Sequence, residues 1–266
     1  MRKRILVIPD IHGRTFWKEP VSRYIKSVYR IVFLGDYLDP YENFIPENIY
    51  NNLQEIIEFK KKHIDKVVLL KGNHDEHYSC ERFRELSGGS RIDNLNWDKY
   101  HKTFNEYKDL FKLVHMDEIN GTPYIFSHAG LTAYWINKVN AFIWWLDNSD
   151  ISLTDSNIIE MINMLDGTIE GQELLSVIGH SRSRRGETTG SVLWADIEEH
   201  QIAQGPKIYG LNRVFQVFGH TNLAVCREDM IIGDNLAMID SQQCFMIDEN
   251  ISKKIVTIAE YEKIIQ

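Results

Sequence analysis

The sequence predicts a mixed α/β fold, and two features of the chain point to it. Three short apolar runs within about the first 70 residues alternate with segments of helical periodicity, which is typical of a sheet with parallel strand pairing. Short apolar runs also dominate the chain after residue 176, and these indicate further strands. We therefore expect sheets with helices packed on their faces.

The first third of the chain contains the clearest elements. Strands are expected at Arg4–Pro9, Arg30–Leu34 and Lys66–Leu70, because each is a short apolar run of the kind found in buried strands. Helical spacing is present near Trp17–Tyr29. A second helix is expected from Pro46 to Lys62, since proline suits the first turn of a helix and the apolar residues follow a period near 3.6.

The rest of the chain is less regular. Residues 78–112 are polar and aromatic and are expected to be largely helical, and residues 131–170 are expected to form a helical insertion or cap. Further strands are expected at Leu113–His115, Tyr124–Ser127, Val177–Ile178, Val192–Trp194, Val214–Phe218, Asn235–Ile239, Cys244–Ile247 and Lys254–Ile258. Since no internal repeat or linker is visible, we expect residues 1–266 to form a single domain.

The composition argues against several classes of protein, although it leaves nucleotides and nucleic-acid ends open as substrates. The net charge of −8 argues against a dedicated binder of duplex DNA or RNA, which usually carries a basic stripe. Three widely spaced cysteines suggest neither a disulfide framework nor a zinc motif. The apolar run near the start is too short for a signal sequence, and no stretch is long enough to span a bilayer. A cytoplasmic protein without a membrane partner is expected.

Side chains that can bind metals follow each of the first three expected strands and two later ones. The five clusters are Asp10–Gly13 (DIHG), Gly35–Asp39 (GDYLD), Gly72–Asp75 (GNHD), Ser127–Gly130 (SHAG) and Gly219–Thr221 (GHT). Ligands in open α/β sheets bind outside the carboxyl ends of strands, so these clusters stand where a site is expected. Alternate residues of an extended segment project to the same side and can chelate one ion.

Taken together, the five clusters resemble the calcineurin-like metallophosphoesterase superfamily, whose pattern is D-x-H, G-D-x-x-D, G-N-H-D/E, a histidine and then Gly-His. The SHAG cluster and Leu193–Asp196 (LWAD) are most similar to the phosphoprotein phosphatase branch and its bacterial diadenosine tetraphosphatase relatives. The resemblance implies a two-sheet β-sandwich flanked by helices, with metals at one edge and a helical cap that selects the substrate.

The resemblance also implies a ligand for each position of a dinuclear metal centre. Asp10 and His12 would bind the first metal, Asp36 would bridge both, and Asn73, His128 and His220 would complete the second site. Two divalent cations, manganese, iron or zinc, suit such a mixed nitrogen and oxygen ligand set. They would supply hydroxide at neutral pH for attack on the phosphorus atom.

His74 has a separate role by the same resemblance. It would protonate the departing alkoxide or hold the phosphoryl group, oriented by Asp39. A neighbouring carboxylate favours the charged, proton-donating form of an imidazole, which makes this pair chemically reasonable. His74 and Asp39 are therefore the expected catalytic pair.

The sequence departs from the phosphatase pattern at Pro40, where the resemblance implies an arginine that binds the substrate phosphate. Arg14, Arg182 and Arg185 are the candidate replacements, because guanidinium groups match phosphate oxygens bidentately. A solvated basic loop is the alternative for Arg182 and Arg185. His180, in a second Gly-His segment, is an alternative to His220 that we rank below it.

These residues leave three functions open. The first is hydrolysis of a phosphomonoester or nucleotide polyphosphate, with a phosphorylated small molecule, nucleotide or phosphoprotein as substrate. The second is a phosphodiesterase acting on cyclic nucleotides or nucleic-acid ends. The third is an interaction scaffold that has lost catalysis, which is disfavoured because Asp36, Asn73 and His74 are all present.

Overall fold

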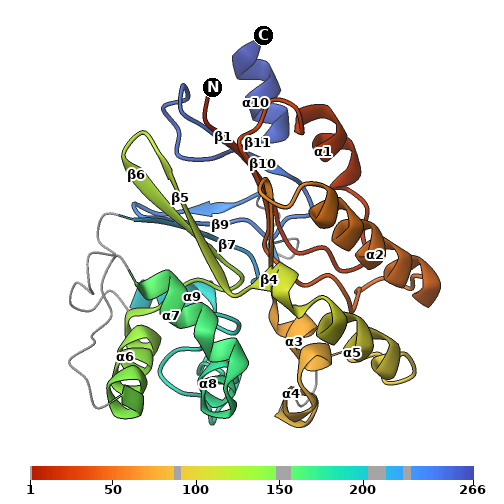
Figure 1. Cartoon of the computed structure of the whole chain (residues 1–266). Coiled ribbons are helices and arrows are strands. Elements are labelled where there is room, and N and C mark those ends of the chain that lie inside the picture. Colours follow the sequence, from red (N-terminus) through yellow and green to blue (C-terminus); the bar gives the residue numbers. More distant parts are fainter. Residues whose placement is uncertain (1, 87–90, 148–156, 203–213, 224–228) are drawn as a thin grey trace. The chain divides into compact units, whose positions relative to one another are not determined.

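The computed structural model describes residues 2–86, 91–147, 157–202, 214–223 and 229–266 (Figure 1). Contacts group the chain into two compact units. The first unit comprises Met1–Lys112, Asn222–Met230 and Ile239–Gln266, and the second comprises Leu113–Thr221 and Ile231–Met238. Each unit is built around one mixed sheet with its own helices.

The first unit contains a six-stranded sheet in the order β11-β10-β1-β2-β3-β4. Its strands are β1 (Arg4–Ile8), β2 (Arg30–Phe33), β3 (Val67–Leu70), β4 (Phe111–Lys112), β10 (Phe245–Asp248) and β11 (Val256–Thr257). β1 to β4 are mutually parallel, whereas β10 pairs antiparallel with both β1 and β11. Because parallel strands share a direction, the carboxyl ends of β1, β2 and β3 meet at one edge of the sheet.

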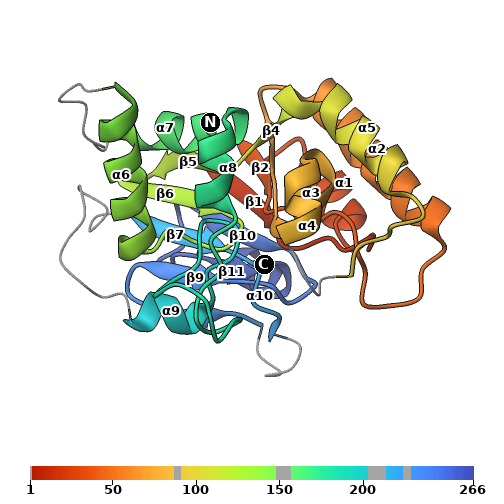
Figure 2. The ribbon, with the colours of Figure 1, turned by 90° about the horizontal axis from the view of Figure 1, so that it is seen from below.

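The helices of the first unit cover this sheet and one another. They are α1 (Lys18–Tyr24), α2 (Pro46–Lys62), α3 (Asn73–Ser79), α4 (Glu81–Leu86), α5 (Trp97–Glu106) and α10 (Ile258–Ile265), with a 3₁₀ turn at Lys108–Leu110. α2 and α5 lie side by side (Figures 1 and 2), joined by an ion pair of 2.9 Å between Lys99 and Glu47 and by contact of the Tyr50 and Tyr100 rings.

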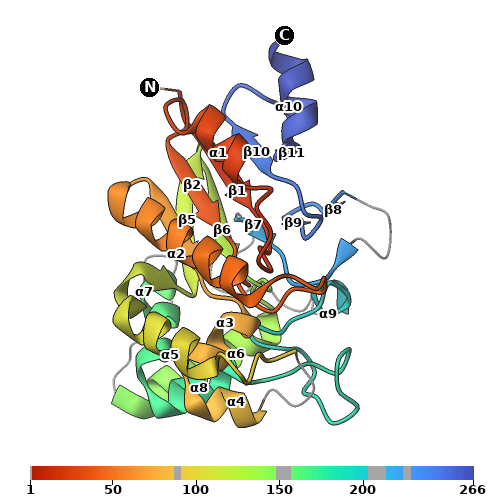
Figure 3. The ribbon, with the colours of Figure 1, turned by 90° about the vertical axis from the view of Figure 1, so that its right-hand side faces the viewer.

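The first and last described segments of the chain lie at the same end of this unit (Figures 1 and 3). Asp248, at the end of β10, accepts hydrogen bonds from Arg2 Nε (2.7 Å) and from the Tyr261 hydroxyl (2.9 Å). Its carboxylate also lies 3.0 Å from Arg4 Nε. One buried carboxylate therefore holds together β1, β10 and α10.

The second unit contains a five-stranded sheet in the order β5-β6-β7-β9-β8. Its strands are β5 (Val114–Ile119), β6 (Thr122–Ser127), β7 (Phe215–Phe218), β8 (Ile231–Ile232) and β9 (Leu236–Met238). Its helices are α6 (Ala133–Asp147), α7 (Ile158–Met164), α8 (Ile169–Leu175) and α9 (Ile197–Ile202), with a 3₁₀ turn at Leu165–Gly167. β6 and β7 are parallel neighbours, so their carboxyl ends, at Ser127 and Phe218, lie side by side.

Most of the predicted elements are confirmed. The helix expected from Pro46 to Lys62 is α2 with the same bounds, and the three early strands differ from β1, β2 and β3 by one residue at an end. The prediction of two sheets flanked by helices is confirmed as well.

Two predicted strands are wrong. Val177–Ile178 and Val192–Trp194 lie in irregular backbone. The amide of Ala129 donates to the Val192 carbonyl, and the amide of Ser191 donates to the Val177 carbonyl. Val192 is nevertheless fully buried, so its run is apolar because it fills the core and not because it extends a sheet.

The expected insertion at 131–170 contains α6, α7 and the start of α8 among its described residues. Whether residues 1–266 fold as one cooperative domain stays a prediction. None of the described helices combines the length and the apolar composition that crossing a membrane requires.

Candidate metal centre

The segments that follow β1 and β2 are joined directly by backbone hydrogen bonds. The amide of His12 donates to the Asp36 carbonyl (2.6 Å), and the amide of Gly13 donates to the Tyr37 carbonyl (2.9 Å). The two segments therefore run together beyond the sheet edge. This pairing brings the side chains of DIHG and GDYLD to one place.

Asp75 ties the segment after β3 to the segment after β2. Its carboxylate is fully buried and accepts three backbone hydrogen bonds, from Asp36 (2.7 Å), Tyr37 (2.9 Å) and Gly72 (2.8 Å). The sequence indicated no role for this residue beyond its place in GNHD. The structure makes it the residue that fixes the position of Asp36.

We expect Asp75→Ala to lower the free energy of unfolding by about 3 kcal/mol or more, because three buried amides would lose their acceptor. Denaturant unfolding of the metal-free protein measures this. Asp65→Ala, at an exposed carboxylate of the same unit, is the matched control and should leave stability nearly unchanged. A decrease of less than about 1 kcal/mol in the free energy of unfolding for Asp75→Ala would contradict the role of Asp75 in fixing the position of Asp36.

Two glycines are required by the close approach of these segments. Gly35 has a φ of +106°, and a Cβ there would lie 2.4 Å from the Gly72 nitrogen. A Cβ on Gly72 would lie 2.1 Å from Asp36 Oδ1, the atom that accepts a hydrogen bond from the His74 amide (3.0 Å). Only glycine allows the backbone to come this close to the Asp36 carboxylate.

The predicted ligands of the first unit are buried and converge. Asp10, His12, Asp36 and Asn73 are each at most 3% exposed. A carboxylate oxygen of Asp10 lies within 4.8 Å of one of Asp36, and His12 Nε2 lies 3.5 Å from Asp36 Oδ2. Carboxylate, imidazole and amide groups form a mixed oxygen and nitrogen set of the kind that divalent transition metals prefer.

The protonation state of His12 suits a metal ligand. Its Nδ1 donates to the Leu38 carbonyl (2.8 Å), which leaves the lone pair on Nε2, the nitrogen nearest Asp36. Burial, reinforced by the charge of His74, lowers the pKa of His12 well below its usual value. The ring is therefore neutral at physiological pH and able to coordinate a cation.

The charge environment of Asp36 also favours a cation. Burial is the main cause that raises the pKa of Asp36 well above its usual value, and the neighbouring carboxylate of Asp75 adds to it. A divalent ion would offset both effects, since a nearby opposite charge favours the ionised form. The residues present thus fit the metal ligation that the sequence predicts.

Backbone strain falls mainly on predicted site residues of the two units. Six described residues other than glycine have a positive φ, and four of them are predicted site residues: His12 (45°), Asp36 (51°), Asp39 (54°) and His220 (70°). Such conformations cost free energy and occur preferentially at functional sites. The positive φ angles of these four residues are consistent with their predicted place in a functional site.

In the second unit, the parallel pair β6 and β7 places two predicted ligands together. His128 Nε2 and His220 Nδ1 lie 3.1 Å apart, and both rings are buried. Two nitrogens that bind one ion at about 2.0–2.1 Å are separated by roughly this distance. His180, the alternative to His220, is half-exposed and hydrogen-bonds through Nδ1 to the Thr188 carbonyl (2.7 Å).

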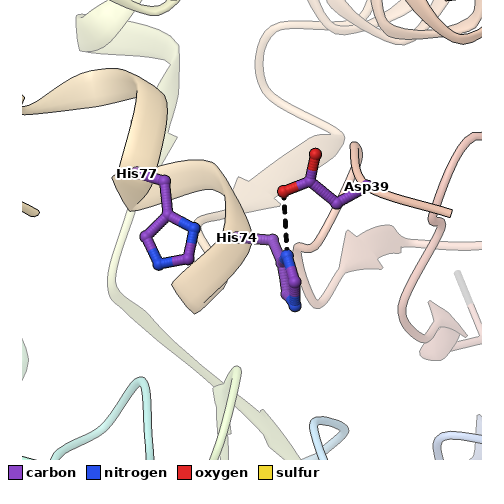
Figure 4. Close-up of side chains that lie close together, drawn as sticks. All are labelled: Asp39, His74 and His77. Atoms are coloured by element: carbon purple, nitrogen blue, oxygen red, sulfur yellow. Dashed lines mark hydrogen bonds and ion pairs between the residues drawn. The ribbon is translucent and has the colours of Figure 1, made fainter. Parts of the chain in front are cut away.

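His74 and Asp39 form the pair that the sequence predicts, with His77 beside them (Figure 4). His74 Nδ1 lies 2.9 Å from Asp39 Oδ2, and His77, one turn further along α3, has its ring centroid 5.5 Å from that of His74. Asp39 also accepts a hydrogen bond from the Tyr78 hydroxyl. Burial raises the pKa of Asp39 to about 7, although the Arg91 guanidinium acts to lower it.

The three side chains in Figure 4 are near enough to one another to hold a cation. However, Asp39 already accepts hydrogen bonds from His74 and Tyr78 and lies in the field of a guanidinium. Burial lowers the pKa of His77 to about 3, so this ring is neutral and could itself ligate, but each oxygen of Asp39 is already engaged by His74 or Tyr78. The arrangement suits orientation of His74 better than metal binding.

Two of the three predicted phosphate-binding arginines are already paired with carboxylates, and the third is exposed. Arg14 is buried and pairs bidentately with Glu42 (2.9 and 3.0 Å). Arg182 pairs bidentately with Asp196 (2.8 and 2.9 Å), and Asp196 also accepts a hydrogen bond from the hydroxyl of Thr221, next to His220. Arg185 is exposed. A substrate role for all three stays a prediction.

Arg182→Ala is expected to lower the free energy of unfolding by about 1–2 kcal/mol, since the buried carboxylate of Asp196 would lose its bidentate partner while the arginine is itself partly exposed. Arg185→Ala should have no such effect. Thermal unfolding of both variants measures the difference. Equal unfolding temperatures for the two variants would mean that the Arg182 pair contributes nothing.

Comparison with known proteins places the chain in a family. Residues 3–224 match the family model of the calcineurin-like phosphoesterases. A protein serine/threonine phosphatase from Saccharomyces cerevisiae, with similarity to human phosphatase PP5, shares the fold with a TM-score of 0.54 and 16% identity, over 96% of this chain and 79% of that one. No curated protein matches the sequence significantly.

A cold-active protein-tyrosine phosphatase of a psychrophile, Shewanella sp., is similar in fold, with a TM-score of 0.50 and 14% identity, over 94% of this chain and 76% of that one. The shared fold, with a buried carboxylate and imidazole set at the carboxyl ends of β1, β2 and β3, defines a metallophosphoesterase. The chain belongs to the calcineurin-like phosphoesterase family.

Proposed function

We propose that the chain hydrolyses a phosphomonoester or a nucleotide polyphosphate at a dinuclear metal centre. The observation that carries this proposal is the presence, in one unit, of converging buried ligands and a separate His74–Asp39 pair. Metal ligands alone would fit a storage or structural site. A histidine held by a carboxylate beside them adds the proton donor that breaking an ester bond requires.

The six predicted ligands would hold two divalent cations. Asp10, His12, Asp36 and Asn73 are the ligands from the first unit, and His128 and His220 are those from the second. When bound, the cations would lower the pKa of water and screen the negative charge of the phosphoryl group. Manganese, iron and zinc all remain candidates, and a cytoplasmic location stays a prediction.

His74 is the proposed proton donor to the leaving oxygen. Its Nδ1 faces Asp39, which leaves Nε2 to point away from the carboxylate and to deliver the proton. Asp39 holds the ring in orientation and stabilises its charged form. The Tyr78 hydroxyl, which donates to the second oxygen of Asp39, fixes the carboxylate in turn.

The substrate class is the open question. The proteins of similar fold include a protein-tyrosine phosphatase and a protein serine/threonine phosphatase, which supports testing phosphopeptides alongside nucleotides. Cyclic nucleotides and nucleic-acid ends are the diester alternative. A non-catalytic scaffold would bind metal without turning over any ester.

Hydrolysis of an aryl phosphomonoester and of the matching aryl diester by the manganese-loaded protein tests the proposal. We expect faster turnover of the monoester, with activity lost on chelation and restored by added metal. Preference for the diester would replace the proposal by the phosphodiesterase alternative. Stoichiometric metal binding without hydrolysis of either ester would favour the scaffold.

A further inference from the structure

Arg91, whose charge acts on Asp39 of the proposed catalytic pair, has no assigned role in the site so far. Its guanidinium stacks on the ring of Tyr41, with Cζ 3.2 Å from the ring centroid. The Tyr41 ring in turn contacts the His12 ring edge to face, with centroids 5.4 Å apart. One aromatic ring thus connects a guanidinium to a predicted metal ligand.

Electrostatics place the charge of Arg91 in the same location. Its guanidinium is among the groups that lower the pKa of Asp39 and of His12. These residues belong to two different segments, one after β1 and one after β2. This agrees with the stacking of Arg91 on Tyr41, whose ring contacts His12.

The hydrogen-bonding state of Arg91 is unusual for an arginine. Its terminal nitrogens, Nη1 and Nη2, are buried and make no hydrogen bond to any described residue. A buried donor without an acceptor is costly, and more so when it is charged. The state is explained if an anion accepts from these nitrogens during function.

Arg14, the other arginine of this region, is in a different state. Its Nε and Nη2 donate to the two oxygens of Glu42, so its charge is already paired with a carboxylate. The segment that follows Asp39, Pro40 to Asn48, contains no lysine or arginine. Arg91 differs from Arg14 in that its terminal nitrogens have no acceptor among the described residues.

We propose that Arg91 binds the phosphoryl group of the substrate, with Tyr41 as the platform that orients its guanidinium. This inference rests on the proposed function for its location and extends it to a specific phosphate-binding residue. The planar guanidinium would donate two parallel hydrogen bonds to phosphate oxygens. Tyr41 is 58% exposed, so this platform lies at the surface of the unit.

Binding of inorganic phosphate to the manganese-loaded protein, measured by calorimetry, tests this inference without relying on turnover. Arg91→Ala should weaken phosphate binding by about 10–100-fold, as expected for the loss of hydrogen bonds to a charged group. Arg91→Lys should lie between Arg91→Ala and wild type, since it keeps the charge but loses the planar fork.

The matched control is Arg84→Ala. Arg84 also stacks on an aromatic ring, Trp97 (4.7 Å to the centroid), and belongs to the same part of the chain. The Arg84→Ala variant should bind inorganic phosphate with the affinity of the wild type. Phosphate affinity in Arg91→Ala equal to that of wild type, with an unchanged unfolding temperature, would overturn the inference, and Arg91→Lys serves as the test variant if Arg91→Ala unfolds.

Ester hydrolysis by the same preparations separates this inference from the proposed function. Hydrolysis by wild type combined with unaltered phosphate affinity in Arg91→Ala would remove the role of Arg91 and leave the proposed function in place. Absence of hydrolysis by wild type combined with Arg91-dependent phosphate binding would support the inference and remove the proposed function.

Discussion

Asp36→Asn is expected to abolish hydrolysis while making the metal-free protein more stable. The substitution removes the carboxylate proposed to bridge the two cations, so turnover of an aryl phosphate should fall by at least about 10³-fold. The amide oxygen of asparagine can still accept the hydrogen bond from the His74 amide, so the local backbone should persist.

The gain in stability follows from the pKa of Asp36. When the pKa of a carboxyl group is higher in the folded than in the unfolded state, the free energy of unfolding of the protein falls as pH rises from the unfolded-state pKa to the folded-state pKa. Asparagine has no such ionisation. In the presence of a chelator at pH 8 the variant should therefore unfold at a higher temperature than wild type, at about 2–4 °C per kcal/mol gained.

The difference between Asp36→Asn and wild type should shrink as pH falls toward about 4, the ordinary pKa of aspartate. Added manganese should raise the unfolding temperature of wild type and have much less effect on the variant. Asp65→Asn, at an exposed carboxylate, is the control for a change of charge alone. A destabilised, metal-free Asp36→Asn at pH 8 would contradict this account.

His74→Ala is expected to slow hydrolysis by an amount that depends on the leaving group. With a poor leaving group, such as an alkyl alcohol, the turnover number should fall by about 10²–10⁴-fold, the usual contribution of a general acid. With a dinitrophenolate leaving group, which departs without a proton, the loss should be less than about 10-fold. Turnover across a series of esters of increasing leaving-group pKa measures this.

Asp39→Asn gives the matched comparison for His74→Ala. It keeps a side chain of the same size near His74 Nδ1 but removes the charge that stabilises the protonated ring. The turnover number of Asp39→Asn should show the same dependence on the leaving group as that of His74→Ala, with smaller decreases. Equal losses for all esters in His74→Ala would show that His74 acts in binding or folding and not as a proton donor.

The sequence predicts the fold of the first unit well because local signals and burial agree there. Each early strand is a run that is apolar throughout, and Pro46 begins α2 at the expected residue. Prediction failed at Val192–Trp194, where the same apolar character arises from burial in irregular backbone. Apolar content by itself cannot distinguish these two cases.

The candidate site is predictable where motif residues follow strands, and less so where contacts span the chain. Asp10, His12, Asp36 and Asn73 are predicted because the motifs that contain them follow strands and resemble the superfamily pattern. Arg91 carries no local signal, since its partner Tyr41 is far away in sequence. Tyr41 itself was the available indication, because an aromatic ring next to Pro40 offers a surface on which a distant arginine can stack.

The antiparallel pairing of β1 with β10 has a consequence for synthesis of the protein. Residues of β1 are translated roughly 240 residues before their partners in β10, a delay of tens of seconds at about 5–20 residues per second. During that delay the edge of β1 opposite β2 leaves its backbone N–H and C=O groups without a strand partner. We therefore expect the pairing of β1 with β10 to form late in folding during synthesis, because it cannot form before β10 has been made.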